Sequence, residues 1–303
     1  MRTRVAIHAV LVAAMSSLAL LSGESCGVAL AEGAQAASAP AGQAEKGEMN
    51  KELRILFVGN SYTSVNNLPK LLTALLAEDG RKVTTGEYLA GGMSFRQHWS
   101  QNLGDDAAVS KDPNAASKPK TRKGQLDKLL AEKDSWDFAV LQGQSLETLT
   151  PAWETAKYAG LLVEKIRQAD PKTQPVFYQT WARQHQPENQ AIISKAYMDL
   201  ARQHKALIAP AGEAWKAAFA ARPTLVLHVA DKSHPTPAGT YLTGCVYYAV
   251  ITGKSPVGLP ARIEFTKGKP AFDLSAEDAK FFQEIAWKTV QRVKAELAET
   301  GAK

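Results

Sequence analysis

Residues 55–63, with the sequence ILFVGNSYT, decide the fold of this chain. Residues 55–58 form a short apolar run typical of a buried β-strand, and residues 59–63 follow as a turn that presents Ser61 at the carboxyl edge of that strand. A serine in this position commonly caps a helix. Capping and chemistry are compatible, because a helix N-terminus aims backbone N–H groups at negative charge that develops on a substrate oxygen.

The rest of the chain alternates short apolar runs with helical patterns. Strands are predicted over residues 54–58, 82–89, 138–141, 175–179 and 206–209, and helices over 68–76, 124–133, 151–168, 190–204, 237–251 and 275–300. Continuous apolar strands separated by helices indicate parallel βαβ units. The sequence therefore predicts one α/β domain over residues 51–303, a three-layer α/β/α sandwich around a mostly parallel five-stranded sheet of the flavodoxin-like kind.

The N-terminus has the features of an export signal. Arg2 and Arg4 precede an uncharged apolar stretch over residues 5–21, and Ala29-Leu30-Ala31 fits a small-x-small cleavage site, with residues 34–36 as a second option. An uncleaved anchor is the alternative, but the stretch is marginal for a membrane span. We therefore predict a signal peptide at 1–31, a disordered tether at 32–50, no stable membrane insertion after cleavage, and a periplasmic or secreted product.

Composition limits the partners and the stabilising elements. The chain has 303 residues, of which 45% are hydrophobic, enough for one substantial core. Its net charge of +6 is not concentrated in a basic tract, and the scattered cations of residues 111–123 are typical of a solvated loop, so no nucleic-acid partner is predicted. Cys26 has a poor lipidation context and would leave with the signal peptide. Cys245 is then alone, and its apolar helical surroundings predict a buried, inert thiol.

The segment Asp231-Lys232-Ser233-His234-Pro235 supplies a candidate base. A serine hydroxyl needs a base within about 3 Å and a group that fixes the tautomer of that base. Among the histidines that follow the signal segment, only His234 has an aspartate at a spacing that lets both side chains project from one tight turn. An Asp-x-x-His pair is common by chance, but its position after the last strand favours Ser61 as nucleophile, His234 as base and Asp231 as the orienting group.

Two further loops carry candidate oxyanion donors. Gly91 and Gly92 follow the second strand, and their backbone could approach the substrate oxygen, although a glycine pair is more often an ordinary turn. Gln142-Gly143-Gln144-Ser145 follows the third strand. Gln144 could donate its side-chain amide to the oxyanion, or it could be polar loop filler.

A third loop suggests a substrate-binding surface. Residues 178–183 read Tyr-Gln-Thr-Trp-Ala-Arg, in which Trp181 could stack on a sugar ring beside the cation of Arg183. The alternative is a tryptophan packed against a neighbouring helix. Residues 93–99 form a similar polar-aromatic stretch. No metal-ligand spacing, phosphate loop or dinucleotide fingerprint is present in the sequence, so neither a metal nor another cofactor is predicted.

These segments, in this order, resemble the SGNH subgroup of the GDSL-type serine hydrolases over about residues 53–251. Gly59-Asn60-Ser61 matches block one, Gly91 or Gly92 matches block two, and Asp231 and His234 match block five. Block three is normally Gly-x-Asn-Asp, and Gly143 and Gln144 stand in its place. The resemblance implies an SGNH-hydrolase fold and an oxyanion hole made by Ser61, Gly92 and Gln144, with Gly91 and Gln142 as competitors.

The predicted function is an exported serine hydrolase that cleaves short-chain carboxylic esters through an acyl-enzyme. Small-molecule or carbohydrate esters are the expected substrates, and O-acetyl groups on a carbohydrate are the narrower prediction. Asn60, Trp181 and Arg183 are the predicted substrate-binding residues. The alternatives are a non-catalytic glycan-binding module, suggested by the missing block-three asparagine, and a thioesterase or arylesterase. The sequence leaves the oligomeric state open.

Overall fold

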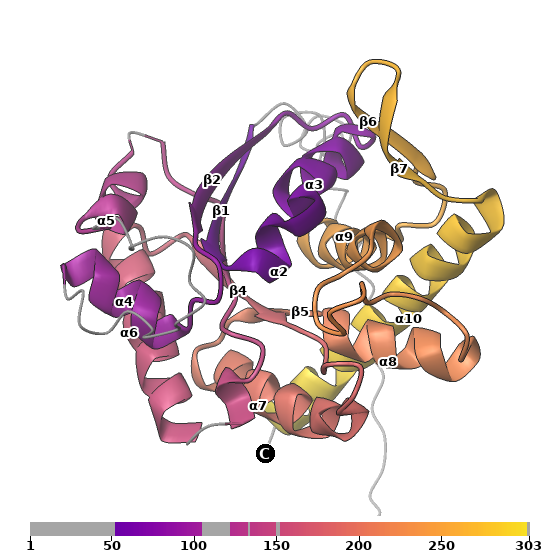
Figure 1. The fold of residues 1–303 in the computed structure, drawn as a ribbon. Helices are drawn as coiled ribbons and strands as arrows, with labels where there is room; N and C mark the ends of the chain where they lie inside the picture. The colour runs from indigo at the N-terminus through magenta and orange to yellow at the C-terminus, as the bar shows by residue number, and fades with distance from the viewer. Residues whose placement is uncertain (1–51, 105–121, 133, 150–151, 302–303) are drawn as a thin grey trace, which may run out of the picture. The chain divides into compact units, whose positions relative to one another are not determined.

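The computed structural model describes residues 52–104, 122–132, 134–149 and 152–301. The predicted signal peptide, the predicted tether and most of the 111–123 loop lie outside these residues. The core is a five-stranded sheet in which every neighbouring pair is parallel. Its order is β2-β1-β3-β4-β5, with β1 at Leu53–Gly59, β2 at Val83–Leu89, β3 at Phe138–Leu141, β4 at Gln174–Gln179 and β5 at Leu207–Pro210 (Figure 1). The five strands predicted from the apolar runs are confirmed.

The alternation of side chains along β1 explains why both faces of the sheet are covered. Ile55 and Phe57 belong to one buried cluster, whereas Leu56 and Val58 belong to another. Successive side chains of a strand point to opposite faces, so an uninterrupted apolar run requires a helical layer on each side. The predicted three-layer α/β/α sandwich is present.

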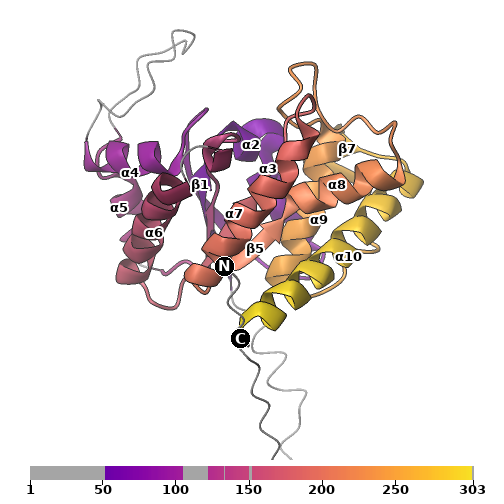
Figure 2. The ribbon, with the colours of Figure 1, turned by 90° about the horizontal axis from the view of Figure 1, so that it is seen from below.

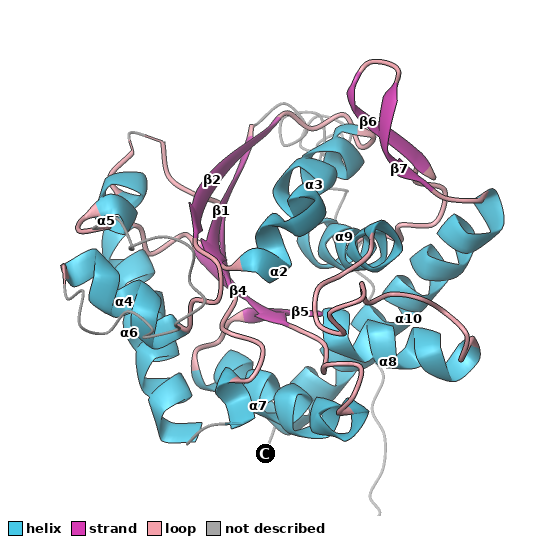
Figure 3. Cartoon of the chain, in the orientation of Figure 1, coloured by secondary structure: helices cyan, strands magenta, loops and turns pink. Residues whose placement is uncertain are grey.

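The helices divide between the two faces of the sheet, as Figure 3 shows in cyan and magenta. The first layer contains α3 (Leu68–Ala77), α8 (Ala211–Ala221), α9 (Pro237–Thr252) and α10 (Ala276–Gly301). The second layer contains α4 (Phe95–Leu103), α5 (Gln125–Leu130), α6 (Ala152–Ala169) and α7 (Gln190–Gln203). Figure 2 shows α8, α9 and α10 packed side by side. No helix in the described part of the chain has both the length and the apolar composition to cross a bilayer.

Two local features agree with the sequence. Asn67 caps α3 at the start of the predicted 68–76 helix, because its Oδ1 accepts from the Lys70 N–H at 3.2 Å, and Pro69 lies in the first turn. Cys245 lies fully buried in α9 with a free thiol, and burial raises its pKa. A thiol of raised pKa is a poor nucleophile, in agreement with the inert role predicted for it.

Three elements differ from the prediction. Residues 93–99 are not a substrate loop: Ser94 starts α4 with a capping box, and Phe95 and His98 are buried. The helix α8 and the hairpin of β6 (Arg262–Thr266) and β7 (Lys269–Asp273) were not predicted. The hairpin lies apart from the central sheet in Figure 1, and its strands are largely exposed. They contain no continuous apolar run, which was the signal used to predict strands.

The strand order reverses direction at one point of the sheet, between β1 and β3. The chain leaves β1 toward β2 on one side, and then returns to build β3, β4 and β5 on the other side. Ligands of open α/β sheets bind at the carboxyl ends of the strands where the order reverses. In this molecule that position lies between the ends of β1 and β3, at Gly59–Asn60 and Gln142–Gly143.

Candidate active site

The predicted nucleophile lies at the junction of β1 and a short helix. β1 ends at Gly59, Asn60 is the N-cap, and Ser61 is the first residue of α2 (Ser61–Ser64). The Asn60 Oδ1 accepts from the Tyr62 N–H at 3.1 Å, so the cap is Asn60 and Ser61 is left to point away from the helix. The Ser61 N–H has no intrahelical acceptor at this position.

The predicted base and its orienting group share one turn. Oδ1 of Asp231 accepts from the backbone N–H groups of Ser233 at 2.8 Å and His234 at 2.9 Å, and Oδ2 lies 2.5 Å from His234 Nδ1. Lys232 has a left-handed φ of 62°, which lets the turn close. Partial burial tends to raise the pKa of Asp231, but the hydrogen bonds from His234 and Ser233 outweigh it and lower that pKa to about 2. Asp231 is therefore ionised at neutral pH.

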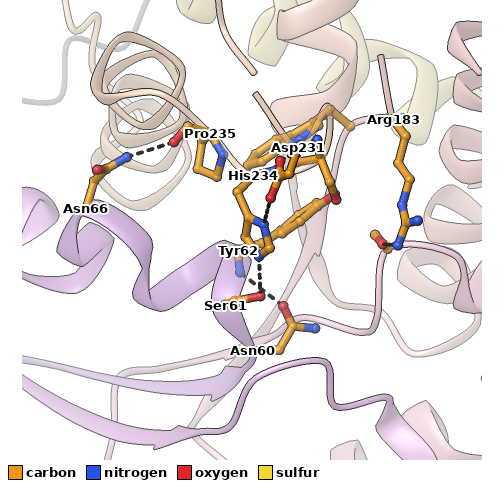
Figure 4. Close-up of polar contacts among 11 residues, drawn as sticks. Asn60, Ser61, Tyr62, Asn66, Arg183, Asp231, His234 and Pro235 are labelled. Atoms are coloured by element: carbon orange, nitrogen blue, oxygen red, sulfur yellow. Dashed lines mark hydrogen bonds and ion pairs between the residues drawn. The ribbon is translucent and has the colours of Figure 1, made fainter. Parts of the chain in front are cut away.

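The turn brings His234 to Ser61. Figure 4 shows His234 facing Ser61, and the distance from His234 Nε2 to Ser61 Oγ is 2.7 Å. Since Nδ1 faces the Asp231 carboxylate, Nδ1 carries the hydrogen and Nε2 is the acceptor for the serine proton. The three predicted residues thus form one continuous hydrogen-bond chain, which is the geometry that activates a serine hydroxyl.

Asn60 joins the three loops that carry the candidate oxyanion donors. Its Nδ2 donates to Met93 O at 2.9 Å and to Gly143 O at 3.1 Å. Asn60 is adjacent to Ser61, Met93 to Gly92, and Gly143 to Gln144. At 3% exposure and with its side-chain oxygen and nitrogen both engaged, Asn60 has no group free for a substrate. Asn60 therefore holds the three loops together and does not contact a substrate, contrary to the prediction.

The two glutamines of the third loop have different environments. Gln142 is buried beneath the nucleophile turn: its Oε1 accepts from the Asn60 N–H at 2.9 Å, and its Nε2 donates to Gly143 O. Gln144 is half-buried, and its Oε1 accepts from the Leu146 N–H at 2.6 Å. Within the described residues no hydrogen bond occupies Gln144 Nε2. The geometry therefore leaves Gln144 the better placed of the two to donate to an oxyanion.

The glycine pair forms an ordinary turn that leaves a donor exposed. Met93 N–H donates to Ala90 O at 3.3 Å across this turn, and Gly92 has φ = 69°. Only glycine adopts that conformation readily. Gly91 and Gly92 are both exposed, and the described part of the chain offers no acceptor to the Gly92 N–H.

Trp181 lies beneath the base-bearing turn, with both ring faces covered. One face stacks on Tyr62 at 4.7 Å between centroids, and the other stacks on Trp215 at 3.8 Å. Its Nε1 donates to Ser233 O at 2.9 Å, and its side chain is 2% exposed. Neither face of the ring is open to a sugar. Trp181 is therefore packed against neighbouring side chains, which was the alternative, and it does not stack on a sugar as predicted.

Arg183 lies closer to the surface of the same region. Its Nη2 donates to Ser145 Oγ at 3.2 Å, and the side chain is half-buried beside the triad in Figure 4. The guanidinium also favours the ionised form of the neighbouring Tyr62, yet burial dominates and raises the Tyr62 pKa. Tyr62 is thus a neutral hydroxyl at the site.

Sequence reasoning missed three residues that hold the site together. Tyr62 OH lies 2.6 Å from Ser233 Oγ, which ties the nucleophile helix to the base-bearing turn. Asn66, with φ = 56°, donates from Nδ2 to Pro235 O at 3.0 Å. Buried Glu147 accepts from the N–H groups of Phe95 at 3.0 Å and Gln144 at 2.8 Å. The only available signal was the Asn66-Asn67 pair, because asparagine tolerates left-handed backbone.

The described residues contain no group of three or more histidine, cysteine, aspartate or glutamate side chains that could hold a metal ion.

Comparisons with known proteins identify the fold. No protein-family model matches the chain. No curated protein matches it. Among solved structures, a candidate SGNH hydrolase from Slackia heliotrinireducens is similar with a TM-score of 0.51 and 26% identity, over 66% of this chain and 100% of that one. A DUF4886 family protein from Bacteroides uniformis shares the fold with a TM-score of 0.58 and 19% identity, over 80% of this chain and 95% of that one. The chain therefore has the fold of the SGNH/GDSL-type serine hydrolases, and these similarities support a serine carboxylic-ester hydrolase of that type.

Proposed function

We propose that this protein is an exported serine esterase that removes short acyl groups, acetyl groups first, from carbohydrate esters. The observation that carries the proposal is the continuous chain from Asp231 Oδ2 through His234 to Ser61 Oγ, with distances of 2.5 and 2.7 Å. A binding module has no physical need for this arrangement, since it activates a hydroxyl and does nothing for ligand affinity.

The first half-reaction forms the acyl-enzyme. Ser61 Oγ attacks the ester carbonyl carbon while its proton moves to His234 Nε2, and ionised Asp231 stabilises the imidazolium. The carbonyl oxygen becomes negatively charged and accepts from the Ser61 N–H, the Gly92 N–H and Gln144 Nε2. The tetrahedral intermediate then collapses, His234 returns the proton to the leaving alkoxide, and the alcohol departs.

The second half-reaction releases the acid. A water molecule gives its proton to His234 Nε2 and attacks the acyl carbon, through the same oxyanion contacts. Collapse of this intermediate breaks the bond to Ser61 Oγ, which recovers its proton from His234. The products are the free enzyme and the carboxylic acid, which then loses its proton to water.

The preference for short acyl groups on a polar alcohol rests on the surroundings of Ser61. Ser233 and Arg183 place a hydroxyl group and a cation near the triad, where the buried hydroxyls of Tyr62 and Ser145 contact them. Such groups match the hydroxyl-rich alcohol of a sugar ester, and they would be left without partners by a long alkyl chain. The export signal predicted over residues 1–31 supports a substrate outside the cytoplasm.

The test compares initial rates on p-nitrophenyl acetate, butyrate and octanoate for the wild-type protein and for Ser61→Ala. We expect turnover that falls with chain length, and a loss of about three to six orders of magnitude in the variant. Preference for octanoate would contradict the short-acyl proposal. Equal inactivity of both folded proteins, together with glycan binding that Ser61→Ala leaves intact, would instead support the binding-module alternative.

Export is tested separately by N-terminal sequencing of the mature protein. Cleavage after Ala31 predicts a first residue of Glu32. A mature protein that still begins at Met1 would contradict the signal-peptide prediction.

A further inference from the structure

A cavity of about 330 Å³ lies between α8 and the segment that follows β4. It contains none of the three triad residues. The side chains that give it chemical character are Trp181, Arg183, Trp215, Lys216, Phe219 and His228. Trp181 and Trp215 of the aromatic stack line the cavity, whereas Tyr62 does not.

The cavity carries uncompensated positive charge. Arg183 and Lys216 line it, and no aspartate or glutamate does. Arg183 donates only to the neutral Ser145 hydroxyl, and its buried Nε has no partner within the described residues. Lys216 is exposed on α8, and the described part of the chain supplies no ion pair for it. Two cations beside apolar walls favour an anionic ligand, and a carboxylate matches the planar fork of a guanidinium.

His228 favours a ligand that carries a hydroxyl group. It is 5% exposed, and its Nε2 lies 3.1 Å from Ala182 O. A carbonyl oxygen only accepts, so Nε2 carries the hydrogen and Nδ1 is the acceptor. Burial lowers the pKa of His228 and keeps the ring neutral at neutral pH. Nδ1 is buried and has no partner among the described residues, so a ligand that brings a hydroxyl supplies the donor that the protein lacks.

The remaining walls are apolar. Phe219 is half-buried, and Leu225 and Pro223 lie on the same side of the cavity. A flat ring with C–H groups on its face packs against such a surface. An alkyl acid would leave His228 without a donor, and a neutral sugar would leave the two cations unpaired.

We infer that this cavity binds an acidic sugar, a ring that carries a carboxylate for Arg183 and Lys216 and hydroxyl groups for His228. The cavity adjoins the catalytic turn, because Trp181 and Gln184 form its wall and donate to Ser233 O and Lys232 O at 2.9 Å each. The acidic sugar is thus a neighbouring unit of the polymer that carries the ester. This last assignment rests on the proposed function.

Binding is measured by titration calorimetry on the full-length Ser61→Ala protein, so that turnover does not enter. The ligands are the trisaccharide of galacturonic acid and the matched trisaccharide of galactose. We expect the acidic trisaccharide to bind at least about tenfold more tightly, which is the factor that one charge-assisted hydrogen bond supplies. Equal affinity for the two ligands, or no binding of the acidic one, overturns the inference.

Variants in the Ser61→Ala background locate the site. Lys216→Gln should weaken binding of the acidic trisaccharide about three- to tenfold, and Lys216→Glu should weaken it further. The control is Lys288→Gln, which removes one exposed charge from α10 outside the cavity and should leave the affinity unchanged. An equal loss in the control, or none in either Lys216 variant, overturns the location.

The wild-type rate on p-nitrophenyl acetate separates this inference from the proposed function. Turnover without acidic-sugar binding removes only the cavity assignment. Binding without turnover on any ester removes the esterase proposal and leaves the cavity as a saccharide site.

Discussion

A single side-chain amide, that of Asn60, connects the carboxyl ends of three strands. It caps α2 and donates to the loops that follow β2 and β3. From the sequence, Asn60 was predicted to be part of a Gly-Asn-Ser turn and a substrate-binding residue, but its contacts to Met93 O and Gly143 O could not be predicted, because they depend on strand order. The sequence alone was enough to single out Ser61, His234 and Asp231, which the structure joins by hydrogen bonds, since each has a distinct chemistry and a local context. The residues that brace them use common amides and hydroxyls, which have no distinct pattern.

The first residue-scale prediction concerns Gln144. Removing its Nε2 donor in Gln144→Ala should cost about 2–4 kcal/mol in kcat/KM on p-nitrophenyl acetate. Gln144→Glu keeps the acceptor for the Leu146 N–H but places an anionic oxygen near the oxyanion, so we expect an equal or larger loss. Gln168→Ala, an exposed change on α6, is the control. Full activity of Gln144→Ala would show that Gln144 is not an oxyanion donor.

The second residue-scale prediction concerns Glu147 and pH. Burial, which the N–H groups of Gln144 and Phe95 only partly offset, raises the Glu147 pKa from 4.5 to about 8. Between these values the folded chain keeps a proton that the unfolded chain has released. The free energy of unfolding should therefore fall as pH rises from about 5 to 8, on the order of 3 kcal/mol from this group.

Urea unfolding of Glu147→Gln across that pH range checks the effect. The variant should have a flatter pH dependence than wild type, whereas exposed Glu188→Gln should follow wild type. Glu154 and Tyr197 lie close enough to Glu147 to influence its charge, and both remain in the variant. An unchanged slope would mean that Glu147 ionises normally in the folded protein.

At the scale of elements, the base-bearing turn is held by contacts from its neighbours as well as by its own hydrogen bonds. Its side chains are well exposed, 48% for Asp231 and 33% for His234. Contacts from Trp181, Tyr62 and Asn66 fix its carbonyl and hydroxyl groups. An exposed turn without such contacts would sample many positions of His234, and the distance to Ser61 would vary.

The element-scale prediction is that Trp181→Phe slows chemistry without weakening substrate binding. Phenylalanine keeps a ring between Tyr62 and Trp215 but loses the N–H that binds Ser233 O. We expect kcat to fall about tenfold with KM nearly unchanged, as befits a residue that positions the base. Trp153→Phe, which changes a tryptophan that is 66% exposed, is the matched control. A raised KM at constant kcat would instead place Trp181 in contact with substrate.

The elements that the sequence missed share a physical cause. α4 begins with Phe95-Arg96-Gln97-His98, and its buried residues are polar as well as apolar, so no apolar stripe marks it. α8 is rich in alanine, whose small side chain gives a weak pattern, and its Trp215 packs on Trp181 from far along the chain. The strands β1, β3, β4 and β5 were predictable because each contains a short uninterrupted apolar run, which burial on both faces of the sheet explains. The edge strand β2 contains polar residues and is only partly buried.

At the scale of the whole molecule, the three-layer arrangement followed from the alternation of strands and helices alone. The cavity beside Trp181 and Trp215 did not, because it is lined by residues from α8, from the segment after β4 and from residues 223–228. Such a site forms only when these segments pack together, so no local pattern in the sequence predicts it.

The molecule-scale prediction uses Cys245 as a reporter of global unfolding. Its thiol is buried in α9 between the sheet and α10. With Cys26 replaced by serine, reaction with a thiol reagent should be slow in the native state and should follow unfolding in urea. Melting temperatures should also agree with and without reductant. Rapid labelling of the native protein would show that α9 opens locally, without global unfolding.

The nucleophile and its base belong to parts of the molecule with different tolerance to change. Ser61 is attached to β1, whose neighbours on both sides are strands and whose side chains fill two cores. His234 is attached to a surface segment. Evolution, or a laboratory library, can therefore vary exposed residues such as His185, Glu188 and Val226 to suit a new alcohol while the position of the attacking oxygen stays fixed. We therefore expect substitutions on the surface near His234 to be tolerated more often than substitutions in the core around Ser61.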